Sequence, residues 1–320
     1  MKKLMFAVAL AGAMTGVCDV TSSNCVGYLG KEAINANSTT WMINTFEKVD
    51  GTVVKLKDFS VKEVLGQTAI HVKLREPSGK IAEVAFGDQG KTIKQYFNYV
   101  HPENPQVAGQ GWKPGWYYAT KEDGKTAVSA VEWKKGDTSA YWAGEVEIPY
   151  GTGFGFERAG NLATLMFSGQ VKGSDAQLEA VNANSTTWLG NCMPVDMTLK
   201  EITIKESLGQ TAIHLKLLEP SGKIKEVAFG DQGKTIKQYF NYVHPENPQV
   251  AGQGWKPGWY YATKEDGKTA VGAVEWKKGD TSAYWAGEVE IKAGDLFGFE
   301  RASNLATVVV PSPLVDHSAK

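Results

Sequence analysis

Apolar and polar residues alternate with a period of two over several short stretches of the chain. Within residues 68–76, Ile70, Val72 and Leu74 alternate with polar residues. This spacing is typical of a β-strand that buries one face, because successive side chains of a strand point to opposite sides. We therefore predict a strand over residues 68–76. Helical periodicity is absent from every window of useful length.

Turn signals separate this strand from others. Residues 77–80 (Pro-Ser-Gly-Lys) predict a turn, since proline fixes its own φ and glycine accepts a positive φ, and residues 81–86 return as the partner strand. Residues 121–125 contain Asp-Gly between two apolar runs, which is a strong hairpin signal. Further strands are predicted over residues 93–100, 116–119, 127–133, 139–142, 145–148, 153–157 and 163–171.

The whole pattern occurs twice. Residues 64–148 and 207–291 align without a gap over 85 positions, and only five of these differ. The offset of 143 residues is far longer than a solenoid repeat, so each copy is expected to be a whole domain with its own core. We predict an all-β protein of two tandem homologous domains, each a β-sandwich or a partly closed β-barrel. The differing pairs are Val64/Ser207, Val72/Leu215, Arg75/Leu218, Ala82/Lys225 and Ser129/Gly272.

The repeat sets the expected domain boundaries. The first domain is placed at residues 19–172 and the second at residues 173–310, with a polar junction near residues 169–179. Residues 311–320 are expected to be a flexible tail.

The first residues read as a secretory signal peptide, assigned to residues 1–18. Lys2 and Lys3 precede an apolar run over residues 4–14, and small residues follow near Cys18. That run is too short to span a bilayer, and no later stretch of the sequence is apolar enough. We expect an exported protein, placed in the extracellular, periplasmic or cell-surface compartment.

Net charge and cysteine content limit the classes of partner and cofactor that the sequence supports. The net charge of −1 supplies no basic excess for nucleic acid. Cys25 and Cys192 remain after signal removal, and an oxidising compartment permits a disulfide between them, with two free thiols as the alternative. Neither cysteine has metal-ligand spacing, and no cofactor motif is present.

Two motifs suggest enzymes, and each has a simpler explanation. Residues 85–92, repeated at 228–235, fit a relaxed phosphate-loop pattern, but they lie between predicted strands rather than between a strand and a helix. We interpret them as a turn. Glu145 and Glu147 share one strand face and could act as an acid–base pair in glycoside hydrolysis, although a solvated strand face explains them as well.

Aromatic residues give the strongest indication of function. Exposed aromatic rings stack on sugars in many extracellular β-domains, whereas buried rings fill a small core. The loop at residues 101–115 is rich in proline and glycine and holds rings that could be exposed. The candidate ligand-binding residues are Trp112, Trp116 and His101, with their counterparts Trp255, Trp259 and His244.

The order of short segments resembles a class of uncharacterised exported bacterial proteins built of tandem β-rich repeats. The matching features are the Lys-Lys signal, the sequence Asn-Cys-Val-Gly-Tyr at residues 24–28, Gly-Trp-Tyr at residues 115–117, Gly-Thr-Gly-Phe-Gly-Phe at residues 151–156 and the apolar segment at residues 163–171. The resemblance implies export and a β-rich fold, and it implies no activity or functional residues.

Three functions follow as hypotheses. The first is an exported, non-enzymatic binding or adhesion protein with two copies of one binding face, for which an extracellular glycan or surface polymer is the partner; duplication raises avidity. The second is a structural component of the cell envelope or extracellular matrix. The third, a secreted carbohydrate-active enzyme, lacks a convergent acid–base set in the sequence.

Overall fold

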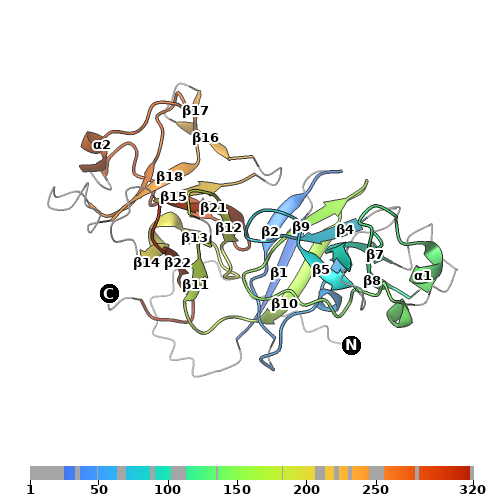
Figure 1. The fold of residues 1–320 in the computed structure, drawn as a ribbon. Coiled ribbons are helices and arrows are strands. Elements are labelled where there is room, and N and C mark those ends of the chain that lie inside the picture. The colour runs from blue at the N-terminus through green and yellow to red at the C-terminus, as the bar shows by residue number, and fades with distance from the viewer. Residues whose placement is uncertain are drawn as a thin grey trace.

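The computed structural model confirms the predicted all-β fold class, with antiparallel pairing in every sheet described. The structure describes residues 25–32, 37–48, 50–62, 70–86, 91–101, 113–134, 136–181, 183–205, 213–219, 223–229, 233–244, 256–277 and 281–317. Within these ranges no sheet closes into a barrel. The two halves of the chain form two lobes (Figure 1).

The first repeat, which we define as strands β1 to β10, contains a three-stranded sheet of order β1-β10-β3 and a five-stranded sheet of order β2-β9-β4-β7-β8. Strands β5 and β6 form a separate hairpin. The elements are β1 (Val26–Glu32), β2 (Thr40–Ile43), η1 (Leu56–Asp58), β3 (Ser60–Lys62), β4 (Ile70–Leu74), β5 (Glu83–Phe86), β6 (Lys91–Lys94), β7 (Tyr96–Val100), β8 (Gly115–Tyr118), α1 (Ala130–Lys134), η2 (Gly136–Thr138), β9 (Gly153–Arg158) and β10 (Thr164–Gln170).

The second repeat, strands β11 to β22, has the corresponding sheets β11-β22-β14 and β12-β21-β15-β18-β19, the hairpin β16-β17 and a short extra pair, β13-β20. Its elements are β11 (Ala176–Glu179), β12 (Thr187–Gly190), β13 (Met197–Thr198), η3 (Leu199–Glu201), β14 (Thr203–Lys205), β15 (Ile213–Leu217), β16 (Glu226–Phe229), β17 (Lys234–Lys237), β18 (Tyr239–Val243), β19 (Gly258–Tyr261), α2 (Ala273–Lys277), β20 (Glu290–Ile291), β21 (Leu296–Arg301) and β22 (Thr307–Val310).

In each repeat the core lies between the three-stranded and the five-stranded sheet. In the first repeat, Phe154 of β9 meets Phe167 of β10 with ring centres 5.8 Å apart. Phe59 packs on both, at 5.3 Å and 4.9 Å. Aromatic rings at these separations gain edge-to-face and offset contacts in addition to the burial of their area. The two-sheet core is the packing that defines a sandwich.

The phosphate-loop-like sequence occurs in a hairpin. Strands β5 and β6 are antiparallel, with Phe86 opposite Lys91, and Phe229 of β16 lies opposite Lys234 of β17. A phosphate loop needs a helix whose first amides face the phosphate, and here a strand follows instead. The same hairpin corrects one predicted pairing, because residues 81–86 meet the preceding strand only at the Arg75–Ile81 bridge and otherwise pair with β6.

Four other predicted strands differ from the structure. The predicted strand 93–100 is divided at Gln95, between β6 and β7. Residues 130–134 of the predicted strand 127–133 form helix α1, whose Trp133 packs on the outer face of the sheet against Val100 and Tyr117. Residues 139–142 follow the η2 turn and make one bridge, Tyr117 to Trp142. Residues 145–148 also make one bridge, from Glu147 to Lys55. Contacts with the sheet, rather than local alternation, decide these conformations.

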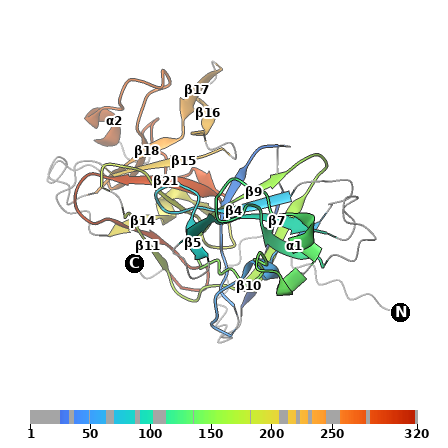
Figure 2. The same cartoon turned by 45° about the vertical axis from the view of Figure 1, so that its right-hand side comes forward.

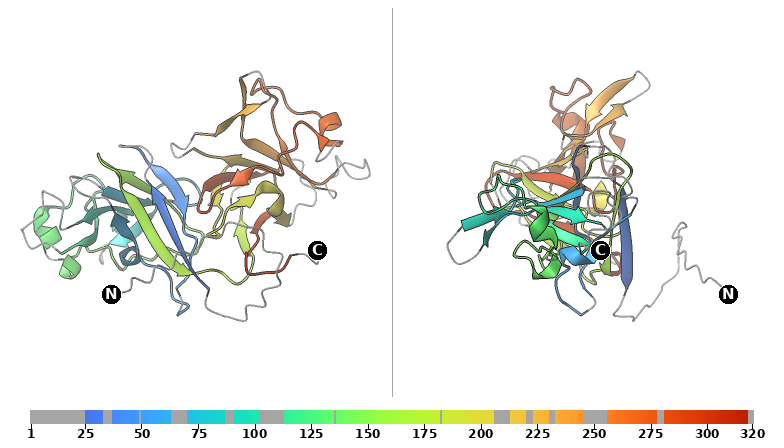
Figure 3. Two further views of the ribbon diagram at one scale, coloured as in Figure 1. Left: turned by 180° about the vertical axis from the view of Figure 1, so that it is seen from behind. Right: turned by 90° about the vertical axis from the view of Figure 1, so that its right-hand side faces the viewer.

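The two repeats meet along their edge strands β2 and β12, whereas α1 and α2 lie at opposite ends of the molecule (Figures 1 and 2). The view from behind shows the same arrangement (Figure 3). Ile43 of β2 is completely buried, and it packs into the core of the second repeat rather than that of its own. Its amide donates a hydrogen bond to the Gly294 carbonyl at 3.0 Å. The junction is therefore continuous packed structure.

No helix in the described ranges is both long enough and apolar enough to cross a membrane.

We predict that Phe167→Ala lowers the free energy of unfolding by about 3–5 kcal/mol, because it leaves a cavity where three other phenylalanines now make contact. Urea denaturation followed by tryptophan fluorescence measures the loss. The control is Val131→Ala, since Val131 is 65% exposed and its truncation should change stability by less than about 0.5 kcal/mol. Equal effects of the two substitutions would contradict the assigned core.

Candidate ligand-binding site

Two of the tryptophans predicted to bind a ligand lie in the core. Trp116 is 1% exposed and Trp259 is 0% exposed. Each indole Nε1 donates to a backbone carbonyl, that of Phe59 at 3.2 Å and that of Ile202 at 2.9 Å. Strands β8 and β19 direct these side chains into the core, on the sheet face opposite to Tyr117 and Tyr260, so neither ring offers a face to a sugar. The expectation for Trp116 and Trp259 is corrected accordingly.

The other predicted ligand-binding residues belong to the Pro/Gly-rich segment at residues 101–115 and its counterpart at residues 244–258. Trp112 and Trp255 fall outside the described residues. His101 and His244 are half-buried, and their rings pack at 5.8 Å from Tyr99 and Tyr242. Tyr99 in turn packs on the buried Trp116 at 4.8 Å.

Cys25 and Cys192 are free thiols, so the suggested disulfide is not formed in the structure. Cys192 is completely buried in the second core, whereas Cys25 packs against the first. Burial raises the pKa of the Cys192 thiol to about 12. The two side chains thus belong to separate cores.

Glu145, one of the two carboxylates suggested for acid–base catalysis, forms exposed ion pairs with two lysines. Glu145 contacts the ammonium groups of Lys57, at 2.5 Å, and Lys55, at 2.9 Å. These hydrogen bonds lower the pKa of Glu145 to about 2. The side chain is therefore ionised at neutral pH and has no proton to donate as a general acid.

A polar cluster recurs on the outer face of each five-stranded sheet. In the second repeat, Glu300 accepts hydrogen bonds from Lys216 at 2.6 Å and Thr186 at 2.5 Å, and Tyr239 lies 3.5 Å away. In the first repeat Glu157 receives the same contacts from Lys73, Thr39 and Tyr96. Because each carboxylate is occupied by these donors, we assign the clusters to sheet stability. Across the described residues, no group of three or more His, Cys, Asp or Glu side chains could hold a metal ion.

The junction between the repeats holds an arginine between two indoles. The guanidinium carbon of Arg75 lies 4.2 Å from the ring centre of Trp41 and 3.8 Å from that of Trp188 in the other repeat. Burial lowers the pKa of Arg75 to about 10, so the side chain is still a cation at neutral pH. Cation–π contacts of this kind contribute about 0.5–2 kcal/mol.

A turn of the first repeat completes this contact. Gly79 has φ of +90° and lies directly against Trp188, where an added Cβ would come within 2.3 Å of the indole Nε1. The Trp188 amide donates to the Pro77 carbonyl at 3.0 Å. Glycine is thus required at position 79 both for the turn and for the approach of the second repeat.

Beside this arginine lies a cavity of about 350 Å³ that both repeats line. Ligand sites typically occupy about 300–1,000 Å³. Its walls are mainly apolar, and Trp41 contributes a half-buried indole. The lining residues are Lys31, Glu32, Thr40 and Trp41 from the first repeat and Leu218, Glu219, Lys225, Lys292, Asp295 and Leu296 from the second.

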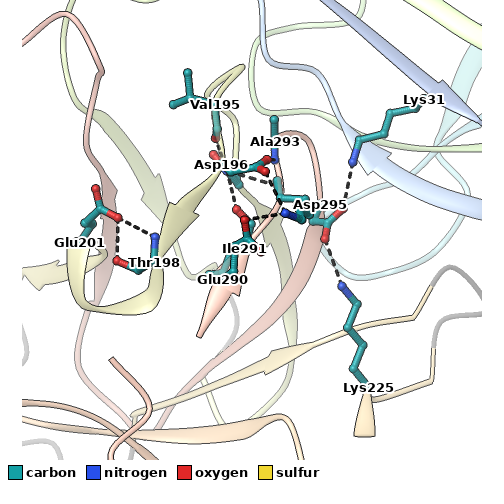
Figure 4. Close-up of polar contacts among 12 residues, drawn as sticks. Lys31, Val195, Asp196, Thr198, Glu201, Lys225, Glu290, Ile291, Ala293 and Asp295 are labelled. Atoms are coloured by element: carbon teal, nitrogen blue, oxygen red, sulfur yellow. Dashed lines mark hydrogen bonds and ion pairs between the residues drawn. The ribbon is translucent and has the colours of Figure 1, made fainter. Parts of the chain in front are cut away.

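The charged side chains of the cavity are linked across the junction. Asp295 binds Lys31 of the first repeat at 3.0 Å and Lys225 of its own repeat at 3.1 Å, and Figure 4 shows both lysines reaching the one carboxylate. The neighbouring Lys292 contacts Asp196 at 3.0 Å. Burial alone would raise the pKa of Asp196, but hydrogen bonds from the Ala293 amide and from Lys292 lower it. Ammonium and carboxylate groups therefore lie side by side at the cavity wall.

The turn at residues 292–295 positions Asp295. The Asp295 amide donates to the Lys292 carbonyl at 3.0 Å, and Gly294 has φ of +74°. An added Cβ on Gly294 would lie 3.0 Å from Leu29 and 3.4 Å from Lys31 of the first repeat. The turn thus depends on glycine, and it brings the carboxylate of one repeat to the lysine of the other.

The sequence contained a signal for this site that prediction from aromatic content missed. Two of the five differing pairs, Arg75/Leu218 and Ala82/Lys225, place a residue at the cavity or next to it. Trp41 also belongs to residues 35–41, which are identical to residues 182–188. Only the contact between the repeats shows that these positions lie together.

We predict that a thiol reagent at about pH 8 modifies Cys25 rapidly and Cys192 only after unfolding, because the reactive thiolate of Cys192 is suppressed by burial. Thiol titration with and without denaturant, on protein that starts at residue 19 and so lacks Cys18, measures this, and Cys25→Ser should abolish the rapid phase. A Cys25–Cys192 bridge found by non-reducing peptide mapping would contradict the prediction.

No family model, no curated protein and no solved structure matches the chain.

Proposed function

We propose that the protein is an exported, non-enzymatic binding protein, and that the junction cavity holds a neutral, hydroxyl-rich ligand of the glycan class. The observation that carries this proposal is the half-buried indole of Trp41 in a cavity whose rim holds both lysines and carboxylates. A sugar presents an apolar face of C–H bonds and a rim of hydroxyls. These two features suit an aromatic wall and paired donors and acceptors.

The balance of charge favours a neutral ligand. Lysines and acidic residues line the cavity in equal number, and Asp295 already neutralises part of the charge of Lys31 and Lys225. An isolated anion or cation would gain little from such a wall. Hydroxyl groups can donate to the carboxylates and accept from the ammonium groups.

Export rests on the basic and apolar residues at the start of the sequence. The non-enzymatic role is supported by the described carboxylates: Glu145 is ionised, and Glu157 and Glu300 each accept hydrogen bonds from a lysine and a threonine. None of these three is placed as a protonated acid opposite a free base, as hydrolysis of a glycoside would need.

We expect Lys225→Ala to weaken glycan binding by about tenfold or more, since hydrogen bonds to charged groups contribute about 1.5–3 kcal/mol. Alanine already occupies the equivalent position 82 of the first repeat, so the substitution suits this fold. A glycan array identifies the ligand, and calorimetry then gives the affinity and a stoichiometry of one ligand per chain. Trp41→Phe, which keeps a smaller ring, should weaken binding less than Trp41→Ala.

The matched control is Lys125→Ala, which removes an exposed lysine in the turn at residues 121–125. Its affinity should equal that of the unchanged protein. Glycan binding that survives Lys225→Ala and Trp41→Ala would place the ligand elsewhere. Absence of binding to every glycan would favour the second hypothesis, a structural component, which the tightly packed junction also suits.

A further inference from the structure

Equivalent positions of the two repeats touch each other at the junction. Gly153 and Leu296 are both the first residue of their strand, β9 and β21, and a Cβ added to Gly153 would lie 3.2 Å from Leu296 Cδ1. Ile43 and Gly190 are both the last residue of β2 and β12, and a Cβ added to Gly190 would lie 3.1 Å from Ile43 Cγ2. Counterparts meet where a rotation axis relates the two repeats. The contacts are also reciprocal, since Gly294 approaches Lys31 and its counterpart Gly151 approaches Leu178, each at 3.4 Å, and this reciprocity is the mark of a two-fold, isologous interface.

Each of these pairs combines a large residue with glycine. Leucine at both Gly153 and Leu296 would place two side chains in the space of one, and glycine at both would leave a void. Overpacking and voids each destabilise a close-packed interior. The surface of each repeat is therefore complementary to the other repeat and not to a copy of itself.

The counterparts Arg75 and Leu218 also differ at the junction, here in charge rather than in size. Arg75 lies between Trp41 and Trp188, which are themselves counterparts. Its equivalent, Leu218, lines the cavity beside Trp41. An arginine at position 218 would bring a second cation to an indole that already holds one, and like charges in a partly buried site repel.

The two sides of the axis have also diverged in polarity. The charged Lys31, Lys225 and Asp295 occupy one side, and the positions equivalent to them by strand register and alignment are the uncharged Leu178, Ala82 and Thr152. One side of the interface therefore carries the charged cavity, and the other carries neutral residues at the same positions.

We propose that the two repeats associate as an internal pseudo-dimer through a two-fold related surface, and that large-for-small exchanges at the axis make each surface specific for the opposite repeat. The partner of the β2 edge of the first repeat is thus the β12 edge of the second repeat in the same chain. The inference does not depend on any ligand.

A double-mutant cycle in the full chain tests the exchange. Gly153→Leu and Leu296→Gly should each reduce the folding equilibrium constant. Combined, the two substitutions move the large side chain to the other side of the axis. Relative to the unchanged protein, the folding constant of the double variant should then be about tenfold or more above the product of the relative constants of the two single variants, as for residues in contact. Urea denaturation without ligand measures all four proteins.

The control cycle pairs Gly153→Leu with Leu199→Gly. Leu199 is as buried as Leu296 and belongs to the same repeat, but it lies in η3 rather than opposite Gly153, so its effect should simply multiply. If the larger substitutions prevent folding, Gly153→Ala with Leu296→Ala should give coupling of the same sign. Independent effects in the junction cycle, equal to those in the control, would overturn the proposal whether or not the cavity binds a glycan.

Discussion

A side chain near a two-fold axis meets its own counterpart, and this constraint determines where the two repeats can be identical. Far from the axis, helices α1 and α2 and the β5-β6 and β16-β17 hairpins face no counterpart, and their sequences agree almost completely. At the axis, Gly153 faces Leu296 and Ile43 faces Gly190. Two identical surfaces would either collide or leave a void there, so the packed junction requires difference.

The same constraint changes what duplication does for function. Two independent copies of one face would raise avidity through effective concentration. Here the cavity takes its lining from both repeats, and the bond from Lys31 to Asp295 crosses between them. Under the proposed function, the duplicated fold supplies a single composite site, held by two packed sandwiches. Such a site is positioned by strands and a glycine turn rather than by long loops, which favours a preorganised geometry.

Alternation along the sequence was sufficient for a strand that buries one face, such as β4, whose predicted and observed positions agree closely. It failed at residues 130–134, because Trp133 packs across the outer face of the sheet and a local pattern carries no record of that contact. Aromatic content, the other signal used, gave Trp116 an exposed role, because the number of rings in a strand does not reveal which face is buried. The junction could not be predicted, since Arg75 and Trp188 are adjacent only after both repeats have folded.

Three of the five differences between the near-identical segments now have physical explanations. Arg75/Leu218 and Ala82/Lys225 belong to the two sides of the junction. Leu215 is larger than Val72, and its core contains Val308 and Val310 where the first core contains the larger Leu165 and Phe167, so volume is exchanged within a core. Nothing in the structure explains Ser129/Gly272, and Val64/Ser207 falls outside the described residues. Recombination that copied one repeat onto the other would erase these differences, and at the axis it would replace a complementary pair by an identical one. The interface therefore opposes complete identity of the two repeats, even where the rest of the fold accepts it.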